Sequence, residues 1–123
     1  MSELFIKLPF PPSVNTYYRN IIINGSPRTL ISKKGRQYRQ NVLGAVCFND
    51  ITRPAMTGRV KLTIELCAPD KRRRDIDNHV KAVQDALTHA NIWGDDEQVD
   101  VLLVVRGAIG KPGHAMVSIE EVT

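Results

Sequence analysis

Cysteine is scarce in this chain of 123 residues, which contains only Cys47 and Cys67. Each of the two stands between apolar neighbours, and they do not form the close pairs that zinc sites use. A structural zinc site is therefore not expected. We expect both cysteines to be buried, reduced thiols, as is typical of a cytosolic protein.

Long hydrophobic runs are absent as well. No stretch approaches the roughly 20 apolar residues that are needed to span a membrane. The first eight residues include Glu3 and Lys7, whereas a signal peptide would carry an apolar run. These absences predict a soluble protein that stays in the cytoplasm and has no membrane partner.

Several common active-site motifs are missing too. No glycine-rich loop has the Walker spacing that cradles nucleotide phosphates, and no serine has the context of a nucleophile elbow. The three histidines lack the spacing of metal ligands. These motifs therefore offer no candidate site.

The chain does have the composition of a folded globular protein. Hydrophobic residues make up 42% of it and charged residues 24%, which is far from the composition of disordered chains. Its length matches one ordinary domain, so we expect residues 1–123 to form a single domain with its own core.

Positive charge dominates, with a formal net charge of +4 and a pI of about 9.3. One basic run extends from Arg19 to Arg39 without any acidic residue, and the other, Lys71–Arg74, is bracketed by Asp70 and Asp75. A single run of this kind is usually a solvated surface, but two runs, one of them beside carboxylates, favour phosphate binding. The candidate contacts to a DNA backbone are Arg28, Lys33, Lys34, Arg36, Arg39, Lys71, Arg72, Arg73 and Arg74.

Hydrophobic periodicity predicts both strands and helices. The Asn24–Gly25 pair indicates a hairpin, with a loop lengthened by Ser26–Pro27. Apolar stripes at helical spacing predict helices at residues 32–50 and 78–90. Alternating apolar residues indicate strands at residues 3–8, 59–68, 99–106 and 115–122. We therefore expect an α/β (α+β) fold in which two main helices pack on a mixed sheet.

The ends and faces of the two helices can be assigned as well. Ser32 is expected to cap the first helix, and Asn91 to end the second in a left-handed conformation. Gly35 and Gly44 each weaken the first helix by about 1 kcal/mol relative to alanine. The buried side of that helix is predicted to carry Tyr38, Val42, Ala45, Val46 and Phe48.

The segment from Asp75 to Lys81 carries the pattern with the most chemical content. Asp75 and Asp77 lie in an expected extended lead-in to the second helix, where alternate side chains point to the same side. Lys81 follows Asp77 by four residues, one helical turn along the same face. A second acidic cluster, Asp95–Glu97, follows the helix. Strand pairing would return it toward the first cluster, an approach that the sequence leaves open.

Converging carboxylates are suited to phosphodiester hydrolysis. Their hard oxygens hold Mg²⁺, which activates water and coordinates the phosphate. A nearby lysine orients the scissile phosphate or offsets charge that develops during attack. The adjacent Lys71–Arg74 run would attract the phosphate backbone that carboxylates alone would repel.

Each of these residues also has an ordinary structural explanation. Asp77 would serve as a helix N-cap, and Asp95 with Asp96 as a turn. Lys81 would pair with Asp77 or Asp85 on a wet surface. For each residue alone the structural explanation is the better one, but the combined pattern beside an arginine run favours a catalytic site.

Two ordered blocks of motif residues cover most of the chain. Residues 8–13, followed by Asn15, Tyr17, Tyr18 and Arg19, form the first block. The second consists of Asp70–Asn78, Lys81–Ala82, Asp85–Thr88, Trp93 and Asp95–Val99. Together with the chain length, these blocks resemble the RusA-type Holliday junction resolvases.

The resemblance implies a mixed α/β fold and a homodimer that makes paired, Mg²⁺-dependent nicks in four-way DNA junctions during recombination and repair. It also implies that Asp75, Asp77 and Asp96 are the essential acidic residues, which we assign as metal ligands. Lys81 is then the catalytic lysine that contacts the phosphate. Asp95 would be an auxiliary ligand. The resemblance further implies a protein of a bacterium or its phage.

Three other functions remain compatible with the residues themselves. The first is a non-catalytic DNA-binding protein whose acidic residues only cap and turn. The second is a metal-dependent phosphohydrolase that acts on small molecules. The third is a structural or assembly protein.

Overall fold

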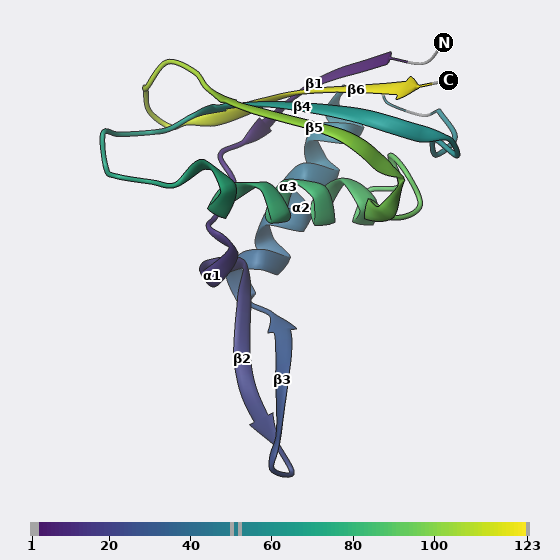
Figure 1. Cartoon of the computed structure of the whole chain (residues 1–123). Helices are drawn as coiled ribbons and strands as arrows, with labels where there is room; N and C mark the ends of the chain where they lie inside the picture. Colours follow the sequence, from purple (N-terminus) through teal and green to yellow (C-terminus); the bar gives the residue numbers. More distant parts are fainter. Residues whose placement is uncertain (1–2, 50, 52, 123) are drawn as a thin grey trace.

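Four strands form a mixed sheet in the order β1-β6-β4-β5 (Figure 1). The structure is a computed structural model that describes residues 3–49, 51 and 53–122. β1 (Glu3–Pro9) pairs antiparallel with β6 (His114–Val122), which pairs antiparallel with β4 (Arg59–Cys67). β5 (Val99–Arg106) pairs parallel with β4 and forms one edge. The predicted strands and the mixed sheet are confirmed.

Two helices, α2 (Lys33–Phe48) and α3 (Val80–His89), lie on one side of this sheet (Figure 1). Alternation along β4 places Val60, Leu62 and Ile64 on the same face of the strand, and all three are 0% exposed. They belong to one hydrophobic core with the buried side chains of both helices. The predicted packing of two main helices on a mixed sheet is confirmed. Within the described part of the chain, no helix is long and apolar enough to cross a membrane.

The chain between β1 and α2 forms a two-stranded hairpin that projects away from the sheet (Figure 1). After the short α1 (Val14–Tyr17), β2 (Tyr18–Ile23) pairs antiparallel with β3 (Ser26–Ile31). Asn24 and Gly25 form the turn with φ angles of 50° and 77°, the positive values that tight hairpin turns require. The predicted longer loop is wrong, because Ser26 and the residue after it pair with β2 as part of β3.

Ser32 caps α2 as predicted, since its hydroxyl accepts a hydrogen bond from the Gly35 amide at 2.9 Å. Val42 and Val46, four residues apart, are buried on one stripe of the helix. The prediction for Phe48 is wrong, because its side chain is 90% exposed. It lies two residues beyond Val46, and therefore about 200° around the helix.

The two cysteines differ in burial. Cys67 is buried, but Cys47 is exposed, so the prediction of two buried thiols is correct only for Cys67. Cys47 follows the buried Val46 by one residue, which turns its side chain about 100° away from the buried stripe. The predicted helix end at Asp50 lies outside the described residues.

The second main helix begins later than predicted. Residues Ile76–His79 form a 3-10 turn, η1, and α3 starts only at Val80. Asn91 follows the helix with a φ of 61°, the predicted left-handed conformation. A second 3-10 turn, η2 (Asp96–Gln98), leads into β5. The two acidic segments of the sequence therefore flank α3.

Candidate functional site

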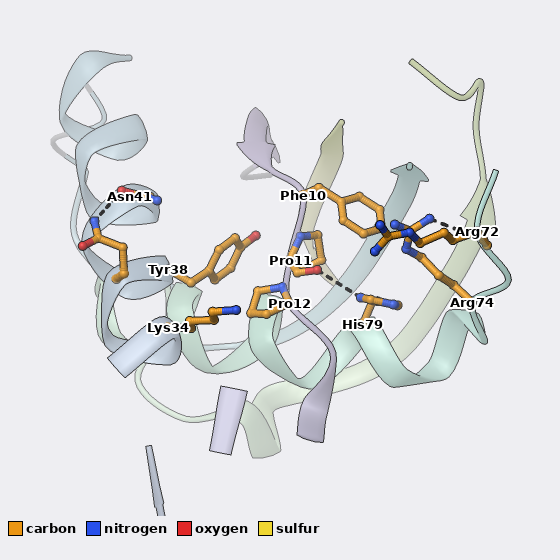
Figure 2. A pocket seen from close by; sticks show the side chains of 10 residues that line it. Phe10, Pro11, Pro12, Lys34, Tyr38, Asn41, Arg72, Arg74 and His79 are labelled. Carbon is orange, nitrogen blue, oxygen red and sulfur yellow. Dashed lines mark hydrogen bonds between the residues drawn. The ribbon is translucent and has the colours of Figure 1, made fainter. Parts of the chain in front are cut away.

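The proline segment after β1 anchors the beginning of α3 (Figure 2). His79 is only 7% exposed, and its Nδ1 atom lies 3.0 Å from the carbonyl oxygen of Pro11. Its ring lies 5.1 Å from the Phe10 ring, and the Arg74 guanidinium lies 5.5 Å from the centre of the same Phe10 ring. Because a carbonyl oxygen only accepts, Nδ1 donates this bond. These contacts hold the segment that carries Asp75 against the proline segment.

A hollow of about 490 Å³ opens beside this anchor. Figure 2 shows Lys34 of α2 on one side of it and Arg72 and Arg74 on the other. An adjoining hollow of about 560 Å³ is lined by Arg72, Arg73, Arg74 and Asp75. We call this combined surface, Lys34 with residues 72–75, the basic hollow. Lys34 of the first basic run therefore lies across one hollow from Arg72 and Arg74 of the second, and the adjoining hollow adds the carboxylate of Asp75.

The predicted DNA-binding residues differ in their availability. Arg74 is only 17% exposed, and its Nη1 atom lies 2.9 Å from Asp70 Oδ1. Arg39 is similarly engaged, since its Nη2 atom lies 2.7 Å from Asp85 Oδ2. These two arginines form ion pairs within the protein. The exposed members of the predicted set are Arg28, Lys33, Lys34, Arg36, Lys71, Arg72 and Arg73.

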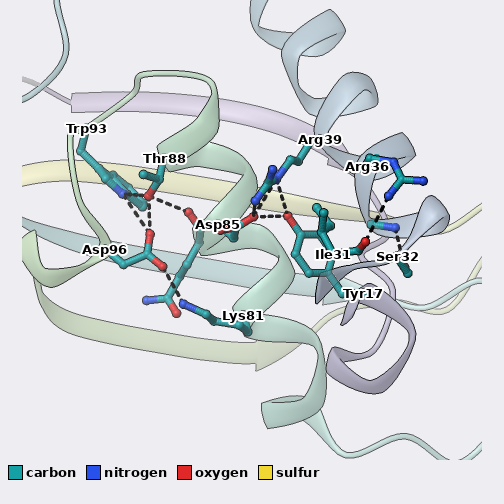
Figure 3. A network of polar contacts seen from close by, with 12 residues as sticks. Tyr17, Ile31, Ser32, Arg36, Arg39, Lys81, Asp85, Thr88, Trp93 and Asp96 are labelled. Atoms are coloured by element: carbon teal, nitrogen blue, oxygen red, sulfur yellow. Dashed lines mark hydrogen bonds and ion pairs between the residues drawn. The ribbon is translucent and has the colours of Figure 1, made fainter. Parts of the chain in front are cut away.

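A polar network along α3 holds the carboxylate of Asp96 (Figure 3). Lys81 Nζ lies 2.9 Å from Asp96 Oδ2. The Thr88 hydroxyl donates to Asp96 Oδ1 and accepts a hydrogen bond from Nε1 of the buried Trp93 at 2.6 Å. Lys81 therefore pairs with a residue of the second acidic segment. Its spacing in the sequence had suggested Asp77, in the first acidic segment, as its partner.

This network sets the charge state of Asp96. Burial alone would raise the pKa of the Asp96 carboxyl, but hydrogen bonds from Thr88 and Lys81 outweigh it, so the pKa lies below its usual value. The hydrogen bond to Asp96 raises the pKa of Lys81 in turn. Both groups are therefore charged at neutral pH, and they present an anion and a cation side by side.

Asp95 has a structural role in the turn before β5. Its side chain accepts a hydrogen bond from the Glu97 amide, and the Gln98 side chain accepts one from the Asp95 amide, each at 3.0 Å. These reciprocal bonds form a capping box around η2. The turn explanation therefore holds for Asp95.

Asp75 and Asp77 are exposed and line different hollows. Asp75 is extended, with φ −88° and ψ 129°, and it lines the basic hollow. Asp77 belongs to η1 and lines a groove of about 340 Å³ between α3 and β5, together with Lys81. Strand alternation therefore does not align the two carboxylates, because the backbone is already helical at Asp77. The spacing of Asp77 and Lys81 does place both on one groove, as predicted.

The donor set fits the chemistry of a hard divalent cation. The Asp75 side chain makes no capping hydrogen bond, and Asp77 follows the cap position of η1, so its N-cap explanation is wrong. The oxygens of these exposed carboxylates are the ligands that Mg²⁺ prefers. Among residues 3–49, 51 and 53–122, however, no three acidic, histidine or cysteine side chains are close enough to hold one ion. The ligands are available but not preassembled.

Comparison of the sequence with known proteins identifies the family of this chain. The family model described as endodeoxyribonuclease RusA matches residues 9–120. The chain belongs to the RusA endodeoxyribonuclease family. The crossover junction endodeoxyribonuclease RusA of Escherichia coli K12 is 41% identical over 121 residues, covering 98% of this chain and 97% of that protein.

Other relatives of this RusA-family chain are equally similar. The RusA proteins of Shigella sonnei strain Ss046 and of Enterobacteria phage 82 are 42% and 41% identical, with the same coverage of 98% of this chain and 97% of each relative. All three relatives carry the name of an endonuclease of crossover junctions. The predicted resemblance to the RusA-type family is confirmed.

A further network in this RusA-family chain joins α1, α2 and α3 (Figure 3). The Tyr17 hydroxyl donates to Asp85, the carboxylate that also pairs with Arg39. Burial, followed by the hydrogen bond to Asp85, raises the pKa of Tyr17. Asp85 follows Lys81 by one helical turn, so the network holds two other elements against the helix that carries Lys81.

Sequence reasoning missed the two residues that orient Asp96 and the pairing of Arg39. Thr88 and Trp93 do occur in the motif block, which was the available signal. Their chemistry could not be read from spacing, because the Trp93 Nε1 and Asp96 Oδ1 atoms reach Thr88 only after the chain turns back at the end of α3. Arg39 stands in a basic run, and its partner is 46 residues away.

Proposed function

We propose that this protein is a structure-selective endodeoxyribonuclease that resolves Holliday junctions by paired, symmetric nicks. The observation that carries the proposal is the basic hollow, where Lys34 lies near the second basic run and the adjoining part of the hollow contains Asp75. Relatives of nearly the same length that are named crossover junction endodeoxyribonucleases support it. In the cell, the activity would serve DNA recombination and repair in the cytoplasm.

Branched DNA is the proposed substrate, and phosphates are its main contact. The exposed cations around the basic hollow, Lys34, Arg72 and Arg73, would each neutralise a phosphate of the backbone. Such binding releases condensed counterions, so the affinity for DNA should fall steeply as salt rises. A small-molecule phosphohydrolase would lack this steep dependence.

We propose Mg²⁺ as the cofactor, held by Asp75, Asp77 and Asp96. When bound, the ion supplies a Lewis acid and lowers the pKa of coordinated water. Lys81 would contact the scissile phosphate and offset charge that develops there, since its ammonium group already lies 2.9 Å from Asp96 Oδ2. Ion binding and the Lys81 ion pair would therefore compete for one carboxylate.

The proposed reaction leaves DNA ends that can be joined again. The basic hollow would bind the backbone, and Thr88 and Trp93 would keep Asp96 oriented. Attack of water on phosphorus, with departure of the 3′ oxygen, leaves a 5′-phosphate and a 3′-hydroxyl. A ligase seals such ends, as resolution of a junction requires.

We further propose that the active form is a homodimer joined through β5. Two nicks on strands of like polarity require two sites related by a two-fold axis. β5 is a free edge of the sheet, and its side chains Val101, Leu102, Leu103 and Val105 are 39–48% exposed. The middle of this edge strand, residues 101–105, carries no charge, and an exposed edge of this kind is a template for pairing with another strand. A second β5 across a two-fold axis would pair with it.

The test of the enzyme is a cleavage assay on a labelled synthetic four-way junction, beside a linear duplex of matched sequence. Wild type and Asp77→Asn are compared in Mg²⁺ and in EDTA. Glu3→Gln serves as the matched control, because it removes an exposed carboxylate of β1, at the opposite edge of the sheet from β5. We expect paired nicks in the junction only, with Mg²⁺ only, in wild type and control.

The Asp77→Asn variant should cleave at least about 100-fold more slowly and bind the junction as well as wild type. Junction binding without cleavage, in several sequences and with several metals, would overturn the enzyme and favour a non-catalytic DNA-binding protein. Cleavage of small phosphate esters without junction binding would favour a phosphohydrolase.

A further inference from the structure

The hairpin of β2 and β3, residues 18–31, forms an arm that stands away from the rest of the molecule (Figure 1). Its apolar side chains are not covered: Ile22 is 76% exposed, Ile23 44% and Leu30 38%. In the pairing register, Ile23 and Ser26 adjoin the Asn24–Gly25 turn, and Ile22 lies opposite Pro27 in the next pair. The end of the arm is therefore an apolar tip.

The stability of the hairpin does not account for the exposed apolar side chains of the tip. The tight turn and the cross-strand hydrogen bond between Thr29 and Asn20, at 3.0 Å, already support the hairpin. An isolated two-stranded hairpin is marginally stable in water, and exposed isoleucines add no stability unless something covers them. The tip is suited to contact with a partner.

The charge of the arm identifies the kind of partner. Arg19 and Arg28 lie on one face of the two-stranded ribbon, because Arg28 pairs directly with Ile21, which lies two residues from Arg19 on β2. No acidic residue occurs between Glu3 and Asp50 in the sequence. The same arm of a second copy would meet like charge, whereas a polyanion is attracted. The arm therefore fits DNA better than another copy of itself.

The arm starts directly at the candidate site. Its first residue, Tyr18, follows Tyr17, whose hydroxyl is bonded to Asp85 on α3. Burial raises the pKa of Tyr18, and the charges of Asp85, Lys81 and Asp96 act on it as well. At the other strand end, the Ser32 hydroxyl and amide bond the carbonyl oxygens of Thr16 and Tyr17. The arm is thus mounted on the elements that carry Lys81.

We propose that the arm inserts its apolar tip, Ile22, Ile23 and Pro27, into the branch point of a DNA junction, while Arg19 and Arg28 contact the flanking phosphates. This inference rests on the proposed function, and it names the element that distinguishes branched from linear DNA. Strands of six residues at about 3.3 Å per residue extend roughly 20 Å, so the tip reaches DNA well beyond the site.

Stacking explains the selectivity. Apolar side chains that enter a linear duplex must separate stacked base pairs, which costs free energy. At a branch point the continuous stack is already interrupted, so the tip buries its isoleucines at lower cost. The arm would therefore add affinity for junctions and little for duplexes.

The test uses junctions with 2-aminopurine either at the branch point or inside one arm of the DNA. Binding is measured in EDTA, so that no cleavage occurs. Wild type is compared with Ile22→Ser/Ile23→Ser. Phe48→Ser is the matched control, because it removes an apolar side chain that is 90% exposed outside the arm. Circular dichroism verifies that each variant is folded.

We expect wild type and control to raise the fluorescence of 2-aminopurine at the branch point only. The double variant should lose this signal. Its preference for junction over duplex should fall at least about tenfold, because binding no longer buries two isoleucine side chains away from water. Arg28→Gln should weaken binding to both DNAs and reduce the slope of log K against log salt by about 1.

Several outcomes would overturn the inference separately from the proposed function. A double variant with wild-type fluorescence and wild-type preference would remove the role of the arm and leave the nuclease intact. Dissociation of a free dimer by the double variant would make the arm a self-association element instead. Loss of junction preference by the double variant, in a protein that never cleaves, would support the arm and overturn the nuclease.

Discussion

Thr88 decides how Asp96 presents its carboxylate. Its hydroxyl lies between the buried Trp93 and Asp96 Oδ1, and Lys81 occupies the other carboxylate oxygen. An aspartate held on both oxygens has little rotational freedom. Under the proposed assignment of Asp96 as a Mg²⁺ ligand, loss of such an orienting residue typically costs about 10–100-fold in metal affinity or activity.

Replacing Thr88 with valine tests this role, since valine keeps the shape and removes the hydroxyl. We expect single-turnover cleavage of a four-way junction in Mg²⁺ to slow by about 10–100-fold, with unchanged binding of the junction in EDTA. The unfolding free energy should also fall by about 1–3 kcal/mol, because Trp93 Nε1 loses its acceptor at 2.6 Å.

Thr88→Ser is the control for this substitution, because serine retains the hydroxyl and should restore most of the rate. If Thr88→Val cleaves at the wild-type rate, the hydroxyl serves only the fold and Asp96 is oriented by Lys81.

At the scale of elements, α2 is packed closely at one end and open at the other. A Cβ atom at Gly35 would lie against the Tyr17 carbonyl oxygen and 2.7 Å from Ile31 Cγ1. A Cβ atom at Gly44 would meet nothing within 4 Å. Both glycines interrupt the same helix, but only Gly35 permits the close approach of the arm's base to α2.

The two alanine variants should therefore differ in sign. Gly44→Ala should raise the unfolding free energy by about 0.5–1 kcal/mol, because alanine lowers the entropy cost of the helix. Gly35→Ala should lower it by about 1–3 kcal/mol, because backbone must move to make space. Urea unfolding of both variants measures the difference, and equal effects at the two positions would contradict the described contact of α1 with α2.

At the scale of the whole molecule, the sheet has one edge that differs from the other. Phe5 on β1 is an isolated exposed aromatic at 67%, whereas β5 exposes a continuous series of aliphatic side chains. The groove that holds Asp77 and Lys81 runs beside β5. A dimer joined at β5 would therefore place two candidate sites next to its two-fold axis.

Charged residues on β5 test this assembly. We expect wild type to sediment as a dimer and Leu103→Lys/Val105→Lys as a monomer, because two lysines at a paired edge repel and remain hydrated. The variant should nick single strands of a junction without pairing the nicks. Phe5→Lys, the control on the opposite edge, should stay dimeric. If wild type sediments as a monomer, the proposed dimer is wrong. If the β5 variant stays dimeric, the interface lies elsewhere.

The sequence by itself determined the elements and the family. Alternation predicted β4 within one residue of its observed end, and the Ser32 cap and left-handed Asn91 occur as expected. These features depend on neighbours a few residues apart, so local rules predict them. The ordered motif blocks, which contain Asp75 and Asp96, indicated the RusA family by their resemblance to it.

Only the tertiary structure decided which side chains meet. Lys81 pairs with Asp96 and not with Asp77, and Arg39 pairs with Asp85. Lys34 joins the arginines after Asp70 around one hollow. These partners lie far apart in the sequence, and their contact depends on how α2 and α3 pack on the sheet. Spacing along the chain describes one element at a time, and a site assembled from several elements follows from their packing.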